Sequence, residues 1–162
     1  MSNRRRLTPA FSVIFWLWCF GWTFAETGKV VGVHDGDSIT ILAAGNEQLK
    51  VRLDGIDAPE LKQPFSQAAK EALSSLVFGK VVNFERLKKD RYGRTISVVF
   101  AGQTNVNLEL VRRGLAWRYD AYSDDPVLLA AQTAAKAARR GLWSDKNPIP
   151  PWEWRASKKK AK

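Results

Sequence analysis

Two acidic clusters lie close together in a chain that is otherwise strongly basic. The first is Asp35-Gly36-Asp37-Ser38, and the second runs from Arg52 to Glu60 as Arg-Leu-Asp-Gly-Ile-Asp-Ala-Pro-Glu. The formal net charge of the chain at pH 7 is +10. A basic surface attracts phosphate chains, whereas carboxylates in the same place repel them unless a hard cation lies between. The pattern therefore predicts a metal site with oxygen ligands inside a protein that binds a polyanion.

Strand-like and helical runs alternate along the chain after residue 25. The predicted strands cover 29–34, 38–42, 48–53, 81–86 and 95–100, and the predicted helices cover 64–78, 105–113 and 126–140. The turn sequences Asp35-Gly36-Asp37 and Gly45-Asn46 join the first three strands into a meander. Strands with helices between and after them predict an α+β domain, a small closed barrel capped by helices.

The first 25 residues have the pattern of a targeting segment. Arg4, Arg5 and Arg6 precede an almost wholly apolar run from Phe11 to Phe24, which ends in small residues. We predict a secretory signal that is cleaved, and hence a secreted or periplasmic protein. The alternative is an uncleaved anchor that holds the domain outside the membrane, since the tryptophans of this run suit a membrane interface.

Cleavage would leave a basic domain without cysteine, because Cys19, the single cysteine, lies in this segment. Of the 26 basic residues three would be lost, so 23 would face 16 acidic ones. Such a domain uses neither disulfides nor thiolate chemistry. We predict one domain over residues 26–154 and a basic, disordered tail over 155–162, which offers weak contact with nucleic acid or anionic lipid.

Five segments in series resemble the staphylococcal-type thermonuclease family. They are Asp35-Gly36-Asp37-Ser38, the run from Arg52 to Glu60, Asp90-Arg91-Tyr92-Gly93-Arg94, the run from Asn107 to Ala116, and Gly141-Leu142-Trp143. Together they span essentially the whole chain after residue 25. The resemblance implies a five-stranded OB-fold barrel with three helices. It also implies a calcium-dependent endonuclease that hydrolyses DNA and RNA, prefers single-stranded or frayed substrate and leaves 3′-phosphate ends.

The resemblance further implies a metal site and a base. Asp37 and Asp57 would be carboxylate ligands of calcium, and the main-chain carbonyl of Ala58 would be a further ligand. The family often has threonine where Ala58 stands, but a main-chain oxygen survives that change. Glu60 occupies the position that activates the attacking water.

The substrate contacts implied by the resemblance come from arginine and tyrosine. Arg52 and Arg94 occupy the positions that hold the scissile phosphate. Tyr92, Tyr119 and Tyr122 lie where nucleotide-contacting tyrosines are found, although the last two are offset from the family pattern.

Elementary chemistry supports these roles independently. Phosphodiester hydrolysis brings water to an anionic phosphorus, and negative charge grows on the phosphate oxygens, so cations must surround them. Calcium takes about six to eight oxygen ligands in a loose geometry. A zinc site would want cysteine or histidine, and the chain after residue 25 has His34 alone.

Each motif also has a structural interpretation, and two other functions compete. Asp-Gly-Asp and Tyr-Gly-Arg are common turn sequences, and Asp35, Asp54 and His34 are expected to have structural roles. The chain could be a non-catalytic binder of single strands, although carboxylates in its groove would then weaken binding. It could also be a surface protein whose lysine-rich tail contacts anionic membrane. We favour the enzyme, and we expect a monomer with no obligate protein partner.

The proposed site poses one geometric difficulty. Arg52 and Asp57 would point to opposite faces of a regular strand, because side chains alternate along it. Both are needed at one phosphate. We therefore predict a bulge or a strand end near Gly55.

Overall fold

Three consecutive strands form the first half of a barrel. The computed structural model describes residues 26–160, and the predicted signal with Cys19 lies outside these described residues. Strands β1 (Glu26–Val33), β2 (Ser38–Leu42) and β3 (Gln48–Leu53) pair antiparallel in sequence order. A short 3-10 turn at Ala44–Asn46 joins β2 to β3. The predicted meander is confirmed.

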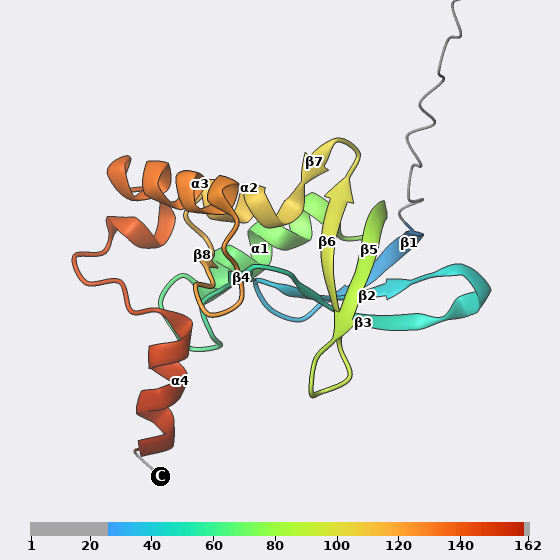
Figure 1. Cartoon of the computed structure of the whole chain (residues 1–162), viewed down its shortest axis with the longest axis horizontal. Helices are drawn as coiled ribbons and strands as arrows, with labels where there is room; N and C mark the ends of the chain where they lie inside the picture. The colour runs from blue at the N-terminus through green and yellow to red at the C-terminus, as the bar shows by residue number, and fades with distance from the viewer. Residues whose placement is uncertain (1–25, 161–162) are drawn as a thin grey trace, which may run out of the picture.

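Two further strands close the barrel. Strand β5 (Val81–Lys89) pairs antiparallel with β1, and β6 (Thr95–Ala101) pairs antiparallel with β5. β6 also pairs in parallel with β3, which joins the two edges of the sheet (Figure 1). The short strand β7 (Thr104–Asn105) extends this sheet beyond β6. The predicted α+β fold, a closed five-stranded OB-fold barrel with helices, is confirmed.

The three predicted helices are present with slightly shorter bounds. They are α1 (Ser66–Val77), α2 (Val106–Arg112) and α3 (Pro126–Ala137). The side chains of Asn105 and Asp125 accept hydrogen bonds from main-chain N–H groups in the first turns of α2 and α3, so each satisfies a donor that has no partner within the helix. α1 buries Ala69, Leu73 and Val77 against the barrel.

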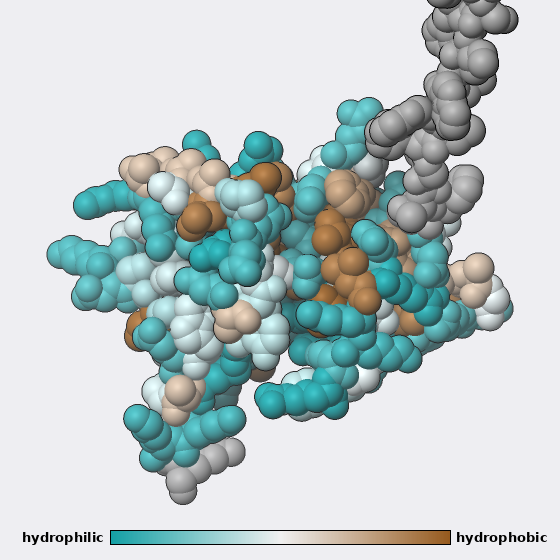
Figure 2. All heavy atoms as spheres, viewed as in Figure 1, coloured by the Kyte–Doolittle hydropathy of each residue, from teal (hydrophilic) through white to brown (hydrophobic). Residues whose placement is uncertain are grey.

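The largest fully buried side chains come from both halves of the barrel and from the helices. They include Phe84 of β5, Ile39 and Ile41 of β2, Leu73 of α1 and Leu110 of α2. This core fixes the helices on the barrel, since burial of such side chains stabilises a fold by roughly 1.5–3 kcal/mol each. Figure 2 shows hydrophilic residues over much of the surface, with apolar residues gathered over β5 and β6.

The C-terminal segment is helical, and the prediction of a disordered tail was wrong for residues 155–160. Helix α4 (Pro151–Lys160) follows the short 3-10 turn Gly141–Ser144 and lies beside the end of the molecule that carries β4 (Ile56–Asp57) and β8 (Trp117–Arg118) (Figure 1). The proline in its first turn favours a helix, because an N–H at that position would have no partner within the helix. The lysines in its last turn favour it as well, because positive charge there interacts favourably with the helix dipole. No helix among residues 26–160 is long and apolar enough to cross a membrane.

Candidate active site

The turn that carries Asp37 packs tightly against two other parts of the domain. A Cβ on Gly36 would lie 2.6 Å from the Cβ of Ala58 and 2.7 Å from the Cβ of Ala69 in α1. Only glycine allows this close approach. The main-chain N–H of Asp37 donates to Oδ1 of Asp35 at 3.0 Å, so Asp35 shapes the turn as expected. The turn buries Asp37 almost completely, with 1% of its surface exposed.

The strand that carries Arg52 ends before Asp57, as predicted. β3 stops at Leu53 and β4 begins at Ile56, with Gly55 between them at φ +70°. This left-handed conformation strains any residue except glycine, and a Cβ here would also lie 2.9 Å from Cδ1 of Leu128. The break in alternation turns Asp57 back toward the side chain of Arg52.

Arg52 joins the two aspartates. Its Nη1 forms an ion pair with Oδ1 of Asp37, and its Nη2 lies 2.5 Å from Oδ1 of Asp57. Asp57 is fully buried, and the side chain of Arg52 is mostly buried. Burial lowers the pKa of Arg52, but the two carboxylates outweigh this effect and the net pKa is raised. The structure therefore brings together three of the predicted site residues.

Asn107 holds the break between β3 and β4 in place. Its Nδ2 donates to the main-chain oxygen of Asp54 at 2.9 Å and of Ser97 at 3.2 Å, and its Oδ1 accepts from the N–H of Val99 at 3.1 Å. A buried side chain at the start of α2 thus fixes the turn next to Gly55 and the neighbouring strand β6. Asn107 lies in one of the segments that resemble the family, but this role was not predicted, because a buried asparagine in a helix gives no distinct local signal.

The environment of Asp37 favours a nearby cation. Burial raises the pKa of Asp37 to about 7, opposed by the Arg52 guanidinium and reinforced by Asp35. Its Oδ2 accepts a 2.6 Å hydrogen bond from the N–H of Ala58, which places the Ala58 backbone beside the carboxylate. A carboxyl group with a raised pKa gains from additional positive charge close by.

The donor set fits calcium better than a softer metal. No three His, Cys, Asp or Glu side chains within residues 26–160 converge as a ready-made metal cluster. An ion at Asp37 and Asp57 would draw its other ligands from main-chain oxygen, water and phosphate, which the loose coordination of calcium allows. The carboxylate oxygens of Asp37 and Asp57 are therefore donors of the kind that calcium accepts.

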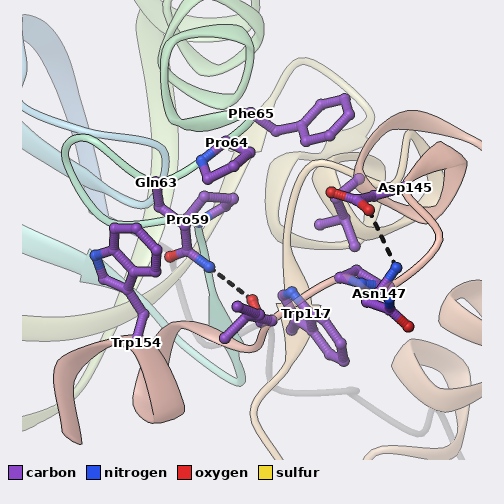
Figure 3. Close-up of a pocket in the computed structure, with 11 residues that line it drawn as sticks. Pro59, Gln63, Pro64, Phe65, Trp117, Asp145, Asn147 and Trp154 are labelled. Carbon is purple, nitrogen blue, oxygen red and sulfur yellow. Dashed lines mark hydrogen bonds between the residues drawn. The ribbon is translucent and has the colours of Figure 1, made fainter. Parts of the chain in front are cut away.

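Glu60 lies at the edge of this site. Its main-chain N–H donates to Oε1 of Gln63 at 2.9 Å. Nε2 of the same glutamine donates to the main-chain oxygen of Ile149 at 2.6 Å, a bond drawn as a dashed line in Figure 3. Gln63 is buried, so it ties the Glu60 loop to the segment that leads into α4. The Glu60 side chain is 37% exposed, which leaves it open to water.

Arg155 is a site residue that sequence reasoning missed. Its Nη2 lies 2.8 Å from Oδ2 of Asp57, and its Nη1 lies 2.5 Å from Oε1 of Glu60. Burial lowers the pKa of Arg155, but Asp57 and Glu60 reverse this effect and the net pKa is raised. The cationic run at the end of the chain concealed it, since a charge run usually indicates a solvated face.

Arg94 and Tyr92 lie in the hairpin between β5 and β6. Nε of Arg94 pairs with Oδ2 of Asp90 at 2.7 Å, and the guanidinium lies 5.7 Å from the centre of the Tyr92 ring. Tyr92 is 70% exposed, and the Arg91 guanidinium also lies over its ring, 4.9 Å from the ring centre. Among the described contacts, the structure does not join Arg94 to the Asp37–Asp57 pair. Thr95, which follows Arg94 in the chain, is the strand-pairing partner of Val51, which directly precedes Arg52.

Tyr119 and Tyr122 belong to an aromatic group beside the site. The Tyr119 ring stacks on the Trp152 ring of α4, with ring centroids 5.3 Å apart and an interplanar angle of 6°. The ring centroids of Tyr119 and Tyr122 are 4.8 Å apart. The main-chain N–H of Tyr119 donates to the oxygen of Gly55 at 2.9 Å. The structure therefore connects this group to the turn that positions Asp57.

A mostly apolar pocket lies between the Glu60 loop and the C-terminal segment. Figure 3 shows residues of the 59–65 segment on one side and Trp117 and Trp154 on others, while Asp145 and Asn147 line a further side. Gln63 donates a hydrogen bond from this pocket to the main-chain oxygen of Ile149 in the C-terminal segment. The pocket shows that α4 is seated on the domain beside the site.

The comparisons with known proteins identify the family of this chain. Residues 50–145 match the family model described as staphylococcal nuclease homologue. The chain is 46% identical over 159 residues to an uncharacterized endonuclease of Haemophilus influenzae, a match that covers 98% of this chain and 89% of that protein. It is 40% identical over 145 residues to a micrococcal nuclease of Shigella flexneri, with 83% of each chain covered. The chain belongs to the staphylococcal nuclease family and is a nuclease, an enzyme that hydrolyses phosphodiester bonds.

Proposed function

We propose that this nuclease uses calcium to cleave DNA and RNA, prefers single-stranded or frayed substrate and leaves 3′-phosphate ends. The observation that carries the proposal is the pair of buried aspartates, Asp37 and Asp57, joined by Arg52, with the half-buried Glu60 at the edge of the site. A non-catalytic binder has no use for buried carboxylates at the place where phosphate must lie. The strongly basic composition supports a polyanionic substrate.

The proposed metal site consists of Asp37, Asp57 and the main-chain oxygen of Ala58. Calcium bound there would supply positive charge to a phosphate oxygen. The two carboxylates are positioned by glycine-dependent turns and by Arg52, so the chain holds them without help from the substrate. Such preorganisation is what makes electrostatic stabilisation effective.

The proposed base and phosphate contacts come from other elements. The Glu60 carboxylate accepts a proton from the attacking water, a role that its partial exposure supports. Arg52 and Arg94 donate hydrogen bonds to phosphate oxygens, on which negative charge grows during attack. Tyr92, whose ring is largely open to solvent, binds nucleotide by stacking.

Tyr119 and Tyr122 are proposed as further nucleotide contacts. Tyr122 is 66% exposed and can receive a base, whereas Tyr119 already stacks on Trp152. We therefore propose that Tyr122 makes the direct contact and that Tyr119 supports it from behind. Base stacking on such a side chain is worth roughly 1–3 kcal/mol.

We also propose that the enzyme is exported. Residues 1–25 carry the pattern of a secretory signal, which supports a secreted or periplasmic enzyme, with an outward-facing membrane anchor as the alternative. A monomer without an obligate protein partner suits this role. Comparing the mass of the mature protein from the culture fluid or periplasm with that of the full chain distinguishes cleavage from anchoring.

Digestion of end-labelled single-stranded DNA and RNA by residues 26–162 tests the proposed function. We expect cleavage of both in calcium and none with a chelator. The products should become substrates for 3′ extension only after phosphatase treatment, because a 3′-phosphate blocks extension. Undiminished cleavage in chelator would refute the calcium requirement, and extension without phosphatase would refute the proposed product ends.

A further inference from the structure

Helix α4 brings a second arginine, Arg155, to the acidic group that Arg52 already contacts, and this arginine pairs with Asp57 and Glu60. Nη1 and Nη2 of Arg155 lie 3.2 Å and 2.8 Å from the two oxygens of Asp57, and Nη1 also lies 2.5 Å from Glu60. Asp57 is fully buried, so this pair is shielded from bulk water. Arg155 is therefore bidentate on Asp57, the strong form of an arginine–carboxylate pair.

Arg155 is delivered to this position by contacts that span α4. Before the helix, the oxygen of Ile149 accepts from Gln63, which also binds the Glu60 main chain. Inside the helix, Trp152 stacks on Tyr119, and Trp154 lines the pocket shown in Figure 3. These contacts fix α4 on the same loops that carry the site.

The guanidinium uses the same oxygens that a divalent cation needs. Oδ1 of Asp57 already accepts from Arg52, and Oδ2 accepts from Arg155. A hard cation at Asp57 must share these oxygens with Arg155 or displace it, and the two positive charges also repel each other. Arg52 comes from a barrel strand and joins both aspartates, whereas Arg155 comes from the end of the chain and contacts Asp57 without contacting Asp37.

We propose that Arg155 competes with the divalent cation for Asp57, so that α4 sets the cation affinity of the active site. This inference rests on the proposed calcium site. When the cation binds, Arg155 releases Asp57, and Glu60 loses a pairing partner at the same step. The helix therefore links cation binding to the freedom of the proposed base.

Calcium titration by calorimetry of residues 26–162, without nucleic acid, tests this competition. Arg155→Gln should bind calcium at least about tenfold more tightly than the wild type, because it removes an opposing charge and frees Asp57. Arg155→Lys, which keeps the charge, should stay close to the wild type. The matched control is Lys159→Gln, which removes one charge from an exposed position on the same helix.

The outcomes separate this inference from the proposed function. Equal, measurable affinities in wild type and Arg155→Gln would overturn the competition and leave the calcium site intact. Equal tightening in Arg155→Gln and Lys159→Gln would overturn it as well, since net charge alone would then explain the effect. If no variant bound calcium, the proposed metal site itself would be refuted. Circular dichroism and thermal unfolding of each variant establish that α4 and the domain remain folded.

Discussion

Nη2 of Arg52 lies 2.5 Å from Oδ1 of Asp57, although the two residues are only five apart in the sequence and would face opposite sides of a regular strand. The contact exists because β3 ends at Leu53 and Gly55 turns the chain through a left-handed conformation. The geometry of the site therefore depends on one glycine and on the groups that hold its turn.

Gly55→Ala should destabilise the domain and reduce activity. The substitution strains a left-handed backbone and brings a Cβ to 2.9 Å from Leu128, so we expect a loss of about 2–4 kcal/mol in the free energy of unfolding. Urea unfolding measures this loss. Gly45→Ala is the matched control, because Gly45 has φ +69° but open space around its Cβ position. Equal losses in the two variants would contradict a packing role for Gly55.

Asn107→Ala should lower the free energy of unfolding by more than the removal of a helix cap does. It leaves the oxygens of Asp54 and Ser97 and the N–H of Val99 without their side-chain partner, which predicts a loss of about 2–4 kcal/mol. Asn105→Ala, which removes the single cap of α2, should cost about 1 kcal/mol. Denaturant unfolding of both variants checks this difference, and similar losses would argue against a special role for Asn107.

The stability of the calcium-free protein should fall as pH rises from about 4 to 7. The pKa of Asp37 is raised from 3.8 to about 7, so the folded state keeps a proton that the unfolded state releases in this window. The folded state therefore binds more protons, and stability declines until the pH passes the folded pKa. Asp37→Asn should remove this slope in chelator, as measured by unfolding at several pH values.

The control for this pH dependence is Asp124→Asn, which changes an exposed carboxylate. It should keep the wild-type slope between pH 4 and pH 7. A slope that persists in Asp37→Asn would show that another group titrates in this window.

Arg94→Ala should remain folded and lose most of its turnover. Arg94 pairs with Asp90 in an exposed hairpin, so its removal affects the core little, whereas loss of a phosphate contact lowers turnover by about a hundred- to a thousandfold. Arg91→Ala, in the same hairpin, should reduce the rate far less. Steady-state cleavage rates in calcium check both variants, and near-normal turnover in Arg94→Ala would refute its proposed role.

Strand and helix periodicity was sufficient to predict the barrel and the three helices packed on it. The acidic turns and the break at Gly55 could also be predicted, because glycine and aspartate give strong local signals and the alternation of a strand is fixed. Contacts between residues far apart in the sequence could not be predicted. Gln63 and Arg155 act across 86 and 95 residues of chain, to Ile149 and Glu60, and no local pattern reveals such contacts.

The position of α4 shows why the tail was misinterpreted. Its lysines have the composition of a solvated end, yet Trp152 and Trp154 seat the helix against the domain. Tertiary packing decided the structure of this segment, since an isolated helix of this length is marginal in water.

The cleavage rate of Glu60→Gln on labelled single-stranded DNA in saturating calcium tests the central claim most directly. The substitution keeps the shape of the side chain but removes the carboxylate that accepts the proton. We predict a rate at least about a hundredfold below the wild type, with DNA binding retained. Glu71→Gln, on the exposed face of α1, should cleave at the wild-type rate. A Glu60→Gln enzyme as fast as the wild type would contradict the proposed base and the site built around it.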